Sequence, residues 1–107
     1  MVPMKDIRRY CNEIAAAFKP RRIILFGSHA YGKPHADSDV DVLVVMPKSR
    51  RLSQHPAADI RMKVRAEFPV DMLVWKEDKV ERRVRDQDTF ATWVTTKGKL
   101  MYEALNA

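Results

Sequence analysis

The chain has 107 residues, 46% of them hydrophobic, with one cysteine and a formal net charge of +6 at pH 7. This length is enough for one domain with its own core, over residues 1–107, and the lone Cys11 excludes an intramolecular disulfide framework and a thiolate zinc site. No apolar run approaches the roughly 20 residues of a membrane span, and residues 1–10 lack the apolar core of a secretory signal, so we expect a cytoplasmic protein.

Helices and strands are expected to alternate along the first half of the chain. Apolar residues recur at helical spacing between Pro3 and Pro20, and proline is tolerated in the first turn of a helix but ends it elsewhere. The run RRIILF then stops at Gly27, and its unbroken apolar part predicts a strand covered on both faces. The expected elements are a helix over residues 3–18, a strand over 21–26, a short helix over 29–32 and a strand over 39–46.

The second half of the chain predicts three more helices and two more strands. Ser53 is expected to cap a helix that stops before Pro69. The order of the elements predicts an α/β fold, a small mixed sheet with helices packed on it. The expected elements are a helix from Ser53 to Phe68, a strand over 70–75, a charged helix over 76–85, a helix capped by Asp86 that ends at Gly98, and a strand over 100–102. The side chains expected on the inner face of the last helix are Phe90, Trp93 and Val94.

A pair of aspartates opens the second expected strand. Asp39 and Asp41 are two residues apart, and side chains alternate between the faces of a strand, so both carboxylates point the same way. Two carboxylates this close repel each other unless a cation lies between them, and Mg²⁺ prefers hard oxygen ligands. If the strand over 70–75 lies alongside, Asp71 joins the pair. Three such acids can hold two metal ions for in-line phosphoryl or nucleotidyl transfer.

Gly27 and Ser28 can supply the other half of such a site. A glycine after a strand lets the backbone approach a ligand closely, and a serine at the start of a helix offers N–H and O–H donors to phosphate oxygens. Each piece also has a simpler interpretation, since Asp-x-Asp is common at solvated strand ends and Gly-Ser is common in turns. The joint pattern is more specific, because these residues fall in order on neighbouring expected elements.

The histidines and tryptophans have simpler interpretations too. His29 and His35 flank the aspartate motif and could contact phosphate or metal, but loop histidines are more often exposed to solvent. His55 lies in a polar connection and is expected to be exposed. Trp75 and Trp93 are expected to pack in the core, with stacking on a nucleobase as the alternative.

The stretch GSHAYGKPHADSDVD resembles the signature of the minimal nucleotidyltransferase (MNT) group of the DNA polymerase β superfamily, which is Gly-Ser, ten residues, then Asp-x-Asp. Asp71 in VDMLVW is similar to the third catalytic acid of that group, and Gly98 with the following tyrosine is similar to its usual ending. Tyr31 stands where many members have arginine. The resemblance covers residues 5–103 and implies a polymerase β palm-like fold.

The resemblance also implies an activity and roles for these residues. The enzyme would transfer a nucleoside monophosphate from ATP or another NTP to an acceptor hydroxyl and release pyrophosphate. Asp39 and Asp41 would bind the Mg²⁺ ions, two in number, that engage the phosphates. Asp71 would complete the second metal site and help to deprotonate the hydroxyl, while Gly27 and Ser28 would contact the β- and γ-phosphates.

Three hypotheses differ in the partner. Small solitary domains of this group resemble the antitoxin of HEPN/MNT toxin–antitoxin pairs, which implies transfer of AMP to a tyrosine of a HEPN-type helical protein encoded nearby. The chain has no room for the second domain with which larger relatives build the acceptor half of the cleft, so the acceptor is expected from a partner or a second subunit. A second hypothesis is a binding module that neutralises a partner by contact. The third, nucleic-acid binding, has only the positive charge in its favour.

Overall fold

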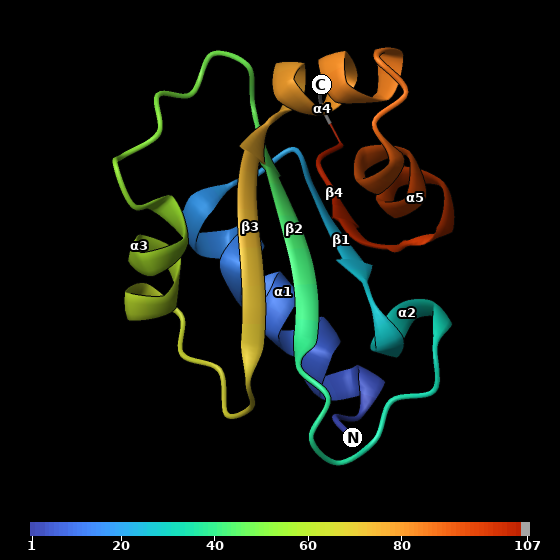
Figure 1. Cartoon of the computed structure of the whole chain (residues 1–107). Helices are drawn as coiled ribbons and strands as arrows, with labels where there is room; N and C mark the ends of the chain where they lie inside the picture. The colour runs from blue at the N-terminus through green and yellow to red at the C-terminus, as the bar shows by residue number, and fades with distance from the viewer. Residues whose placement is uncertain (106–107) are drawn as a thin grey trace.

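A four-stranded mixed sheet organises the computed structural model, which describes residues 1–105 (Figure 1). The order of the strands is β3–β2–β1–β4. The central strand β1 pairs antiparallel with β2 and β4, whereas β2 and β3 are parallel. The predicted α/β fold with a small mixed sheet is therefore confirmed. The strands are β1 (Arg22–Phe26), β2 (Val40–Met46), β3 (Val70–Lys76) and β4 (Lys99–Glu103).

Helices cover both faces of this sheet. The helices are α1 (Met4–Phe18), α2 (Ser28–Tyr31), α3 (Pro56–Lys63), α4 (Glu77–Arg85) and α5 (Thr89–Lys97). In Figure 1, α1 crosses behind the sheet, while α4 and α5 gather at the upper end and α2 lies at the lower end. Among residues 1–105, no helix combines the length and the apolar character that crossing a bilayer requires.

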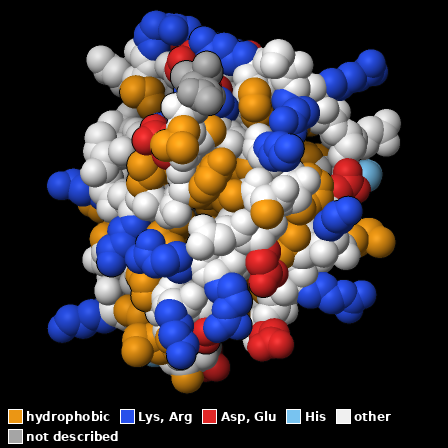
Figure 2. All heavy atoms as spheres, turned by 180° about the vertical axis from the view of Figure 1, so that it is seen from behind, with side chains coloured by type: hydrophobic (Ala, Val, Ile, Leu, Met, Phe, Trp, Pro, Cys, Tyr) orange, Lys and Arg blue, Asp and Glu red, His pale blue; other side chains and the backbone are white. Residues whose placement is uncertain are grey.

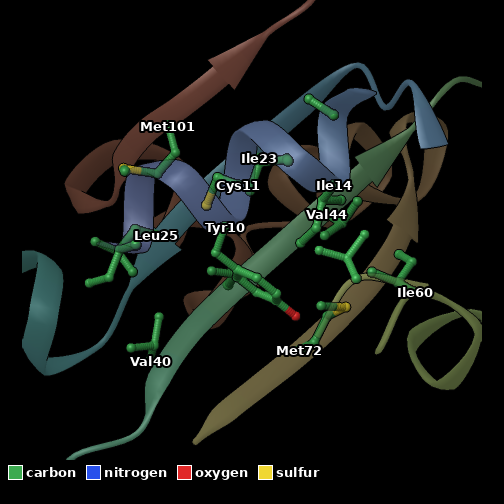
Figure 3. Packing of buried hydrophobic residues seen from close by; sticks show 14 of the residues in the cluster. Tyr10, Cys11, Ile14, Ile23, Leu25, Val40, Val44, Ile60, Met72 and Met101 are labelled. Atoms are coloured by element: carbon green, nitrogen blue, oxygen red, sulfur yellow. The ribbon is translucent and has the colours of Figure 1, made fainter. Parts of the chain in front are cut away.

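The larger part of the core lies between the sheet and α1. Side chains of α1, among them Cys11 and Ile14, pack over alternate residues of the strands, such as Leu25 and Val44 (Figure 3). Cys11 is fully buried, as expected of a small apolar residue, and burial raises the pKa of its thiol to about 12.

The intervening strand residues pack on the other face against α4 and α5. Ile24, Leu43 and Val45 form a second cluster with Val80 of α4 and Val94 of α5. β1 therefore has buried side chains on both faces, as its apolar sequence predicts.

The helix expected from Ser53 to Phe68 is shorter at both ends. Its N-cap is His55, while the hydroxyl of Ser53 donates to the carboxylate of Asp59. Its last residue is Lys63, and Val64 is already extended. The apolar residues beyond this point pack on the core without forming a helix. Phe68, for example, packs edge-on against Tyr10 with ring centroids 5.6 Å apart.

The last helix begins two residues later than expected. Gln87 has a left-handed φ of 62°, which reverses the chain after α4, and Asp88 rather than Asp86 caps α5. Its carboxylate accepts a hydrogen bond of 2.8 Å from the N–H of Ala91. Val94 faces inward as predicted. Phe90 is 37% exposed but still packs edge-on against Phe26 and Trp75 of the sheet, with ring centroids 5.4 and 5.7 Å apart. Trp93, at 48% exposed, does not face the core.

Replacing Asp88 with alanine is expected to lower the melting temperature at pH 7. The Ala91 N–H, followed by the Arg83 side chain, lowers the pKa of Asp88 below its ordinary value of 3.8. A group with a lowered folded pKa stabilises the protein fully above 3.8 and loses that effect as the pH falls through the folded pKa. The difference in melting temperature from the parent, followed by circular dichroism, should therefore shrink in strongly acidic solution. Asp86→Ala is the control, and an equal deficit for Asp88→Ala at every pH would contradict this account.

Candidate active site

The register of β2 and β3 sets two of the predicted carboxylates side by side. The strands are parallel neighbours, and Asp41 is the register partner of Asp71. Partners in adjacent strands project from the same face of the sheet, which here is the face of α4 and α5. Asp39 comes one residue before β2 begins. The three residues therefore gather at the starts of β2 and β3, at the lower end of the sheet in Figure 1.

The three carboxylates have unequal surroundings. Asp39 and Asp71 are exposed, whereas Asp41 is partly buried. Burial, and then the nearby carboxylates of Asp71 and Asp39, raise the pKa of Asp41 above its ordinary value. The negative charge of Asp41 is therefore disfavoured in the absence of a cation, and a cation bound between these groups would relieve it.

Gly27 lies beside Asp41, in the turn that follows the neighbouring strand β1. Phe26 at the end of β1 is the register partner of Asp41, so the turn that follows β1 lies against this carboxylate. Gly27 has a φ of +75°, and a Cβ atom added there would lie 2.0 Å from the Oδ2 atom of Asp41. Only glycine allows the turn and the carboxylate to lie so close together.

Ser28 is the first residue of α2 and lies directly after this turn. The helix is a single turn of four residues, closed by the N–H of Gly32, which donates to the carbonyl of Ser28. A helix this short has little macrodipole, so its attraction for phosphate would come from individual N–H and O–H donors.

His29 is the functional candidate whose surroundings the sequence did not reveal. It was expected to be exposed, but it is 8% exposed and has hydrogen-bond partners on both ring nitrogens. Its Nδ1 atom lies 3.1 Å from the backbone carbonyl oxygen of Asp39, and its Nε2 atom lies 3.3 Å from the backbone nitrogen of Val2. His35 and His55 are exposed, as expected.

The donor set fits Mg²⁺ only together with a substrate. Within residues 1–105, no three His, Cys, Asp or Glu side chains lie close enough together to hold a metal ion unaided. Carboxylates are the hard oxygen ligands that Mg²⁺ prefers, and this ion is usually held by one or two of them plus substrate phosphates. These aspartates would therefore need the phosphates of a bound nucleotide to complete the coordination of the ion.

Two tryptophans lie on the same side of the sheet as the carboxylates. Trp75 is partly buried against the second cluster, as expected, with the Nζ atom of Lys79 4.6 Å from its ring centroid. Trp93 is 48% exposed and does not belong to the core, which corrects the expectation for this residue. It makes an edge-to-face contact with the exposed Tyr31 of α2, with ring centroids 5.5 Å apart.

One hollow of the surface lies away from the carboxylates. It has a volume of about 360 Å³ and is lined by the start of α1 and by the segment from Arg65 to Phe68. The aspartates instead lie on an open part of the sheet, where Asp39 and Asp71 are accessible from solution.

Solved structures with the same fold support this view of the chain. A protein assigned as a nucleotidyltransferase from Sulfolobus solfataricus superposes with a TM-score of 0.66 at 20% identity, over 96% of this chain and 82% of the other. A toxin–antitoxin complex with AMP-PNP gives a TM-score of 0.55 at 20% identity, over 92% and 74%. The toxin–antitoxin MntA–HpeT, in a form with two aspartate-to-glutamate substitutions, gives 0.57 at 17% identity, over 92% and 74%.

The sequence itself matches a family model. No curated protein matches the chain significantly. The model of the nucleotidyltransferase domain, however, matches residues 4–93, which include β1, β2, β3 and all three aspartates. Because this match spans most of the chain, and the fold agrees with it, the chain belongs to the nucleotidyltransferase domain family.

Proposed function

We propose that this chain transfers AMP from ATP to an acceptor hydroxyl and releases pyrophosphate. The observation that carries the proposal is the parallel register that places Asp41 beside Asp71, with Asp39 before them and Gly27 packed against Asp41. This arrangement gathers hard oxygen ligands next to a turn that a phosphate chain can approach closely.

Each residue has a role in this reaction. The carboxylates of Asp39, Asp41 and Asp71 would hold Mg²⁺, in two ions as the resemblance implies. When bound, Mg²⁺ would neutralise charge on the phosphates and polarise the α-phosphoryl group. The backbone at Gly27 and the N–H and hydroxyl of Ser28 would hold the β- and γ-phosphates.

The transfer itself is an in-line displacement at the α-phosphorus. The acceptor oxygen forms a bond to this phosphorus as the bond to the bridging oxygen of the β-phosphate breaks, and pyrophosphate leaves. Asp71 would accept the proton of the attacking hydroxyl, as the resemblance implies, and its exposed carboxylate is accessible to an acceptor from solution. Positioning and charge neutralisation would supply most of the rate enhancement.

The acceptor is proposed to be a tyrosine of a HEPN-type toxin encoded nearby, which would make this chain an antitoxin of the cytoplasm. Two of the similar solved structures are toxin–antitoxin complexes, and one of them was solved with AMP-PNP. The open position of Asp39 and Asp71 suits a hydroxyl carried by another protein, because a large partner can reach it.

The test determines whether the α-phosphate or the γ-phosphate of ATP is transferred. The purified chain is incubated with Mg²⁺ and the product of the adjacent gene, using ATP labelled either at the α- or at the γ-phosphate. Labelling of a tyrosine by the α-label alone is the expected result. Labelling from the γ-position would show phosphoryl transfer instead, and the absence of labelling with every NTP would contradict the proposal.

A second candidate is a module that neutralises its partner by contact alone. The exposed aromatic pair of Tyr31 and Trp93 favours it, because such side chains are common at the centres of protein interfaces. A tight complex without labelling in the same experiment would select this function. On the α1 face, the basic side chains are interspersed with apolar and acidic ones, so this face offers no continuous basic surface to a nucleic acid (Figure 2).

A further inference from the structure

We propose that His29 is a positioning residue, which holds the backbone at Asp39 so that the carboxylate of Asp39 faces its site. The inference rests on the proposed function, because it concerns one of the residues assigned to metal binding. It adds one of the ten intervening residues to which the signature of Gly-Ser and aspartates assigns no role.

The partners of His29 fix the form of its ring. The carbonyl oxygen of Asp39 can only accept a hydrogen bond, so Nδ1 carries a hydrogen and donates it. The backbone N–H of Val2 can only donate, so Nε2 is unprotonated and accepts. Both nitrogens are thus used by one neutral tautomer, in a side chain that is 8% exposed.

The carbonyl that His29 binds belongs to the point where β2 begins. Asp39 precedes the first residue of the strand, and the connection before it is largely exposed. On the other side of the same peptide, the N–H of Val40 donates to the carbonyl of Pro69 over 2.9 Å. The peptide between Asp39 and Val40 is therefore held from two sides, by α2 and by the segment that leads into β3.

Loss of the hydrogen bond from His29 would leave this peptide held only by the bond to the carbonyl of Pro69. The Asp39 peptide could then rotate about the strand end, and its carboxylate would move with it. Groups that orient a metal ligand typically contribute about 10- to 100-fold to metal affinity or activity. We expect an effect of that size on the nucleotide–metal complex.

Two substitutions separate the hydrogen bonds. His29→Asn places an amide N–H near the position of Nδ1 and keeps the donor to Asp39, while the bond to Val2 is lost. His29→Gln places an amide oxygen near the position of Nε2 and keeps the acceptor for Val2, while the donor to Asp39 is lost. His35→Gln, in the exposed connection, is the matched control.

The measurement does not depend on turnover. Binding of Mn²⁺ in the presence of AMPCPP, whose α–β bridge resists transfer, is followed by electron paramagnetic resonance for each variant. His29→Asn and the control are expected to stay within a few-fold of the parent, and His29→Gln is expected to bind roughly 10- to 100-fold more weakly. Nitrogen-15 NMR of the parent ring should show hydrogen on Nδ1.

The outcomes also separate this inference from the proposed function. Equal weakening by Asn and Gln with equal loss of melting temperature, or hydrogen on Nε2, would show mere structural support and overturn the inference. Unchanged binding in His29→Gln would overturn it as well. If the parent binds Mn²⁺ and AMPCPP but labels no acceptor, the proposed function fails while the comparison of Asn with Gln still decides the role of His29.

Discussion

Replacing Asp41 with asparagine is expected to lower kcat/KM for nucleotidyl transfer by about 100-fold or more, the usual cost of removing one charge-stabilising group. Asp41 is the central carboxylate of the candidate site. It lies beside Asp71 in the sheet and against Gly27 in the turn, and it is the least exposed of the three acids. Asparagine keeps the shape of the side chain but removes the negative charge that a hard cation requires.

The same substitution is expected to leave the metal-free protein at least as stable as the parent. Burial and the carboxylates of Asp71 and Asp39 raise the pKa of Asp41, so its ionised form is disfavoured in the folded state. For a carboxyl with a raised folded pKa, stability decreases as the pH rises from 3.8 through the folded pKa. Asparagine carries no charge that the folded state would disfavour, so the melting temperature of the Asp41→Asn variant at neutral pH should equal or exceed that of the parent.

Activity and stability are therefore expected to change in opposite directions, which a merely structural role would not produce. Steady-state labelling and thermal melts on the same preparations give both quantities. Asp86→Asn, at the exposed C-cap of α4, removes one carboxylate elsewhere and should leave transfer unchanged. Transfer that survives Asp39→Asn combined with Asp41→Asn would remove the catalytic assignment of these residues.

The sequence predicted the elements that carry Gly27 and the three aspartates, because the signals for these elements are local. A glycine after an apolar run, aspartates with a period of two and prolines at helix ends each report on a few neighbouring residues. The helix between the strands at 39–46 and 70–75 favours a parallel pair, and this pair is what places Asp71 beside Asp41. The family match and the fold agree with the resemblance drawn from the motif.

What the sequence missed depends on contacts between distant residues. His29 is buried and accepts a hydrogen bond from the N–H of Val2, which lies 27 residues earlier, and no local pattern reports that contact. Phe68 and Trp93 continue apolar stripes of the expected helices, but Phe68 packs from a connection and Trp93 lies half exposed against Tyr31. An apolar stripe predicts which side chains tend to be buried. Whether such a side chain lies in a helix, and whether it reaches the core, depends on contacts in the folded chain.

Replacing Gly27 with alanine is expected both to destabilise the protein and to lower transfer strongly. Gly27 combines a φ of 75° with a ψ of −159°, a conformation that is almost restricted to glycine and costs other residues about 1–3 kcal/mol. The added Cβ atom would also lie 2.0 Å from the Oδ2 atom and 3.0 Å from the Cγ atom of Asp41. Since the backbone on both sides is held by the sheet and by α2, the carboxylate of Asp41 must move.

The two causes of this loss can be separated by a double-mutant cycle with Asp41→Ala. Truncating Asp41 removes the Oδ2 and Cγ atoms that an alanine at position 27 would meet, but it leaves the backbone strain in place. The free energy of unfolding of the double variant, from urea titration, should therefore exceed the value expected from adding the two single effects. Transfer should stay absent, because the ligand itself is gone. Strict additivity would show that the turn and the carboxylate do not touch in solution, and the close approach on which the phosphate site depends would then be wrong.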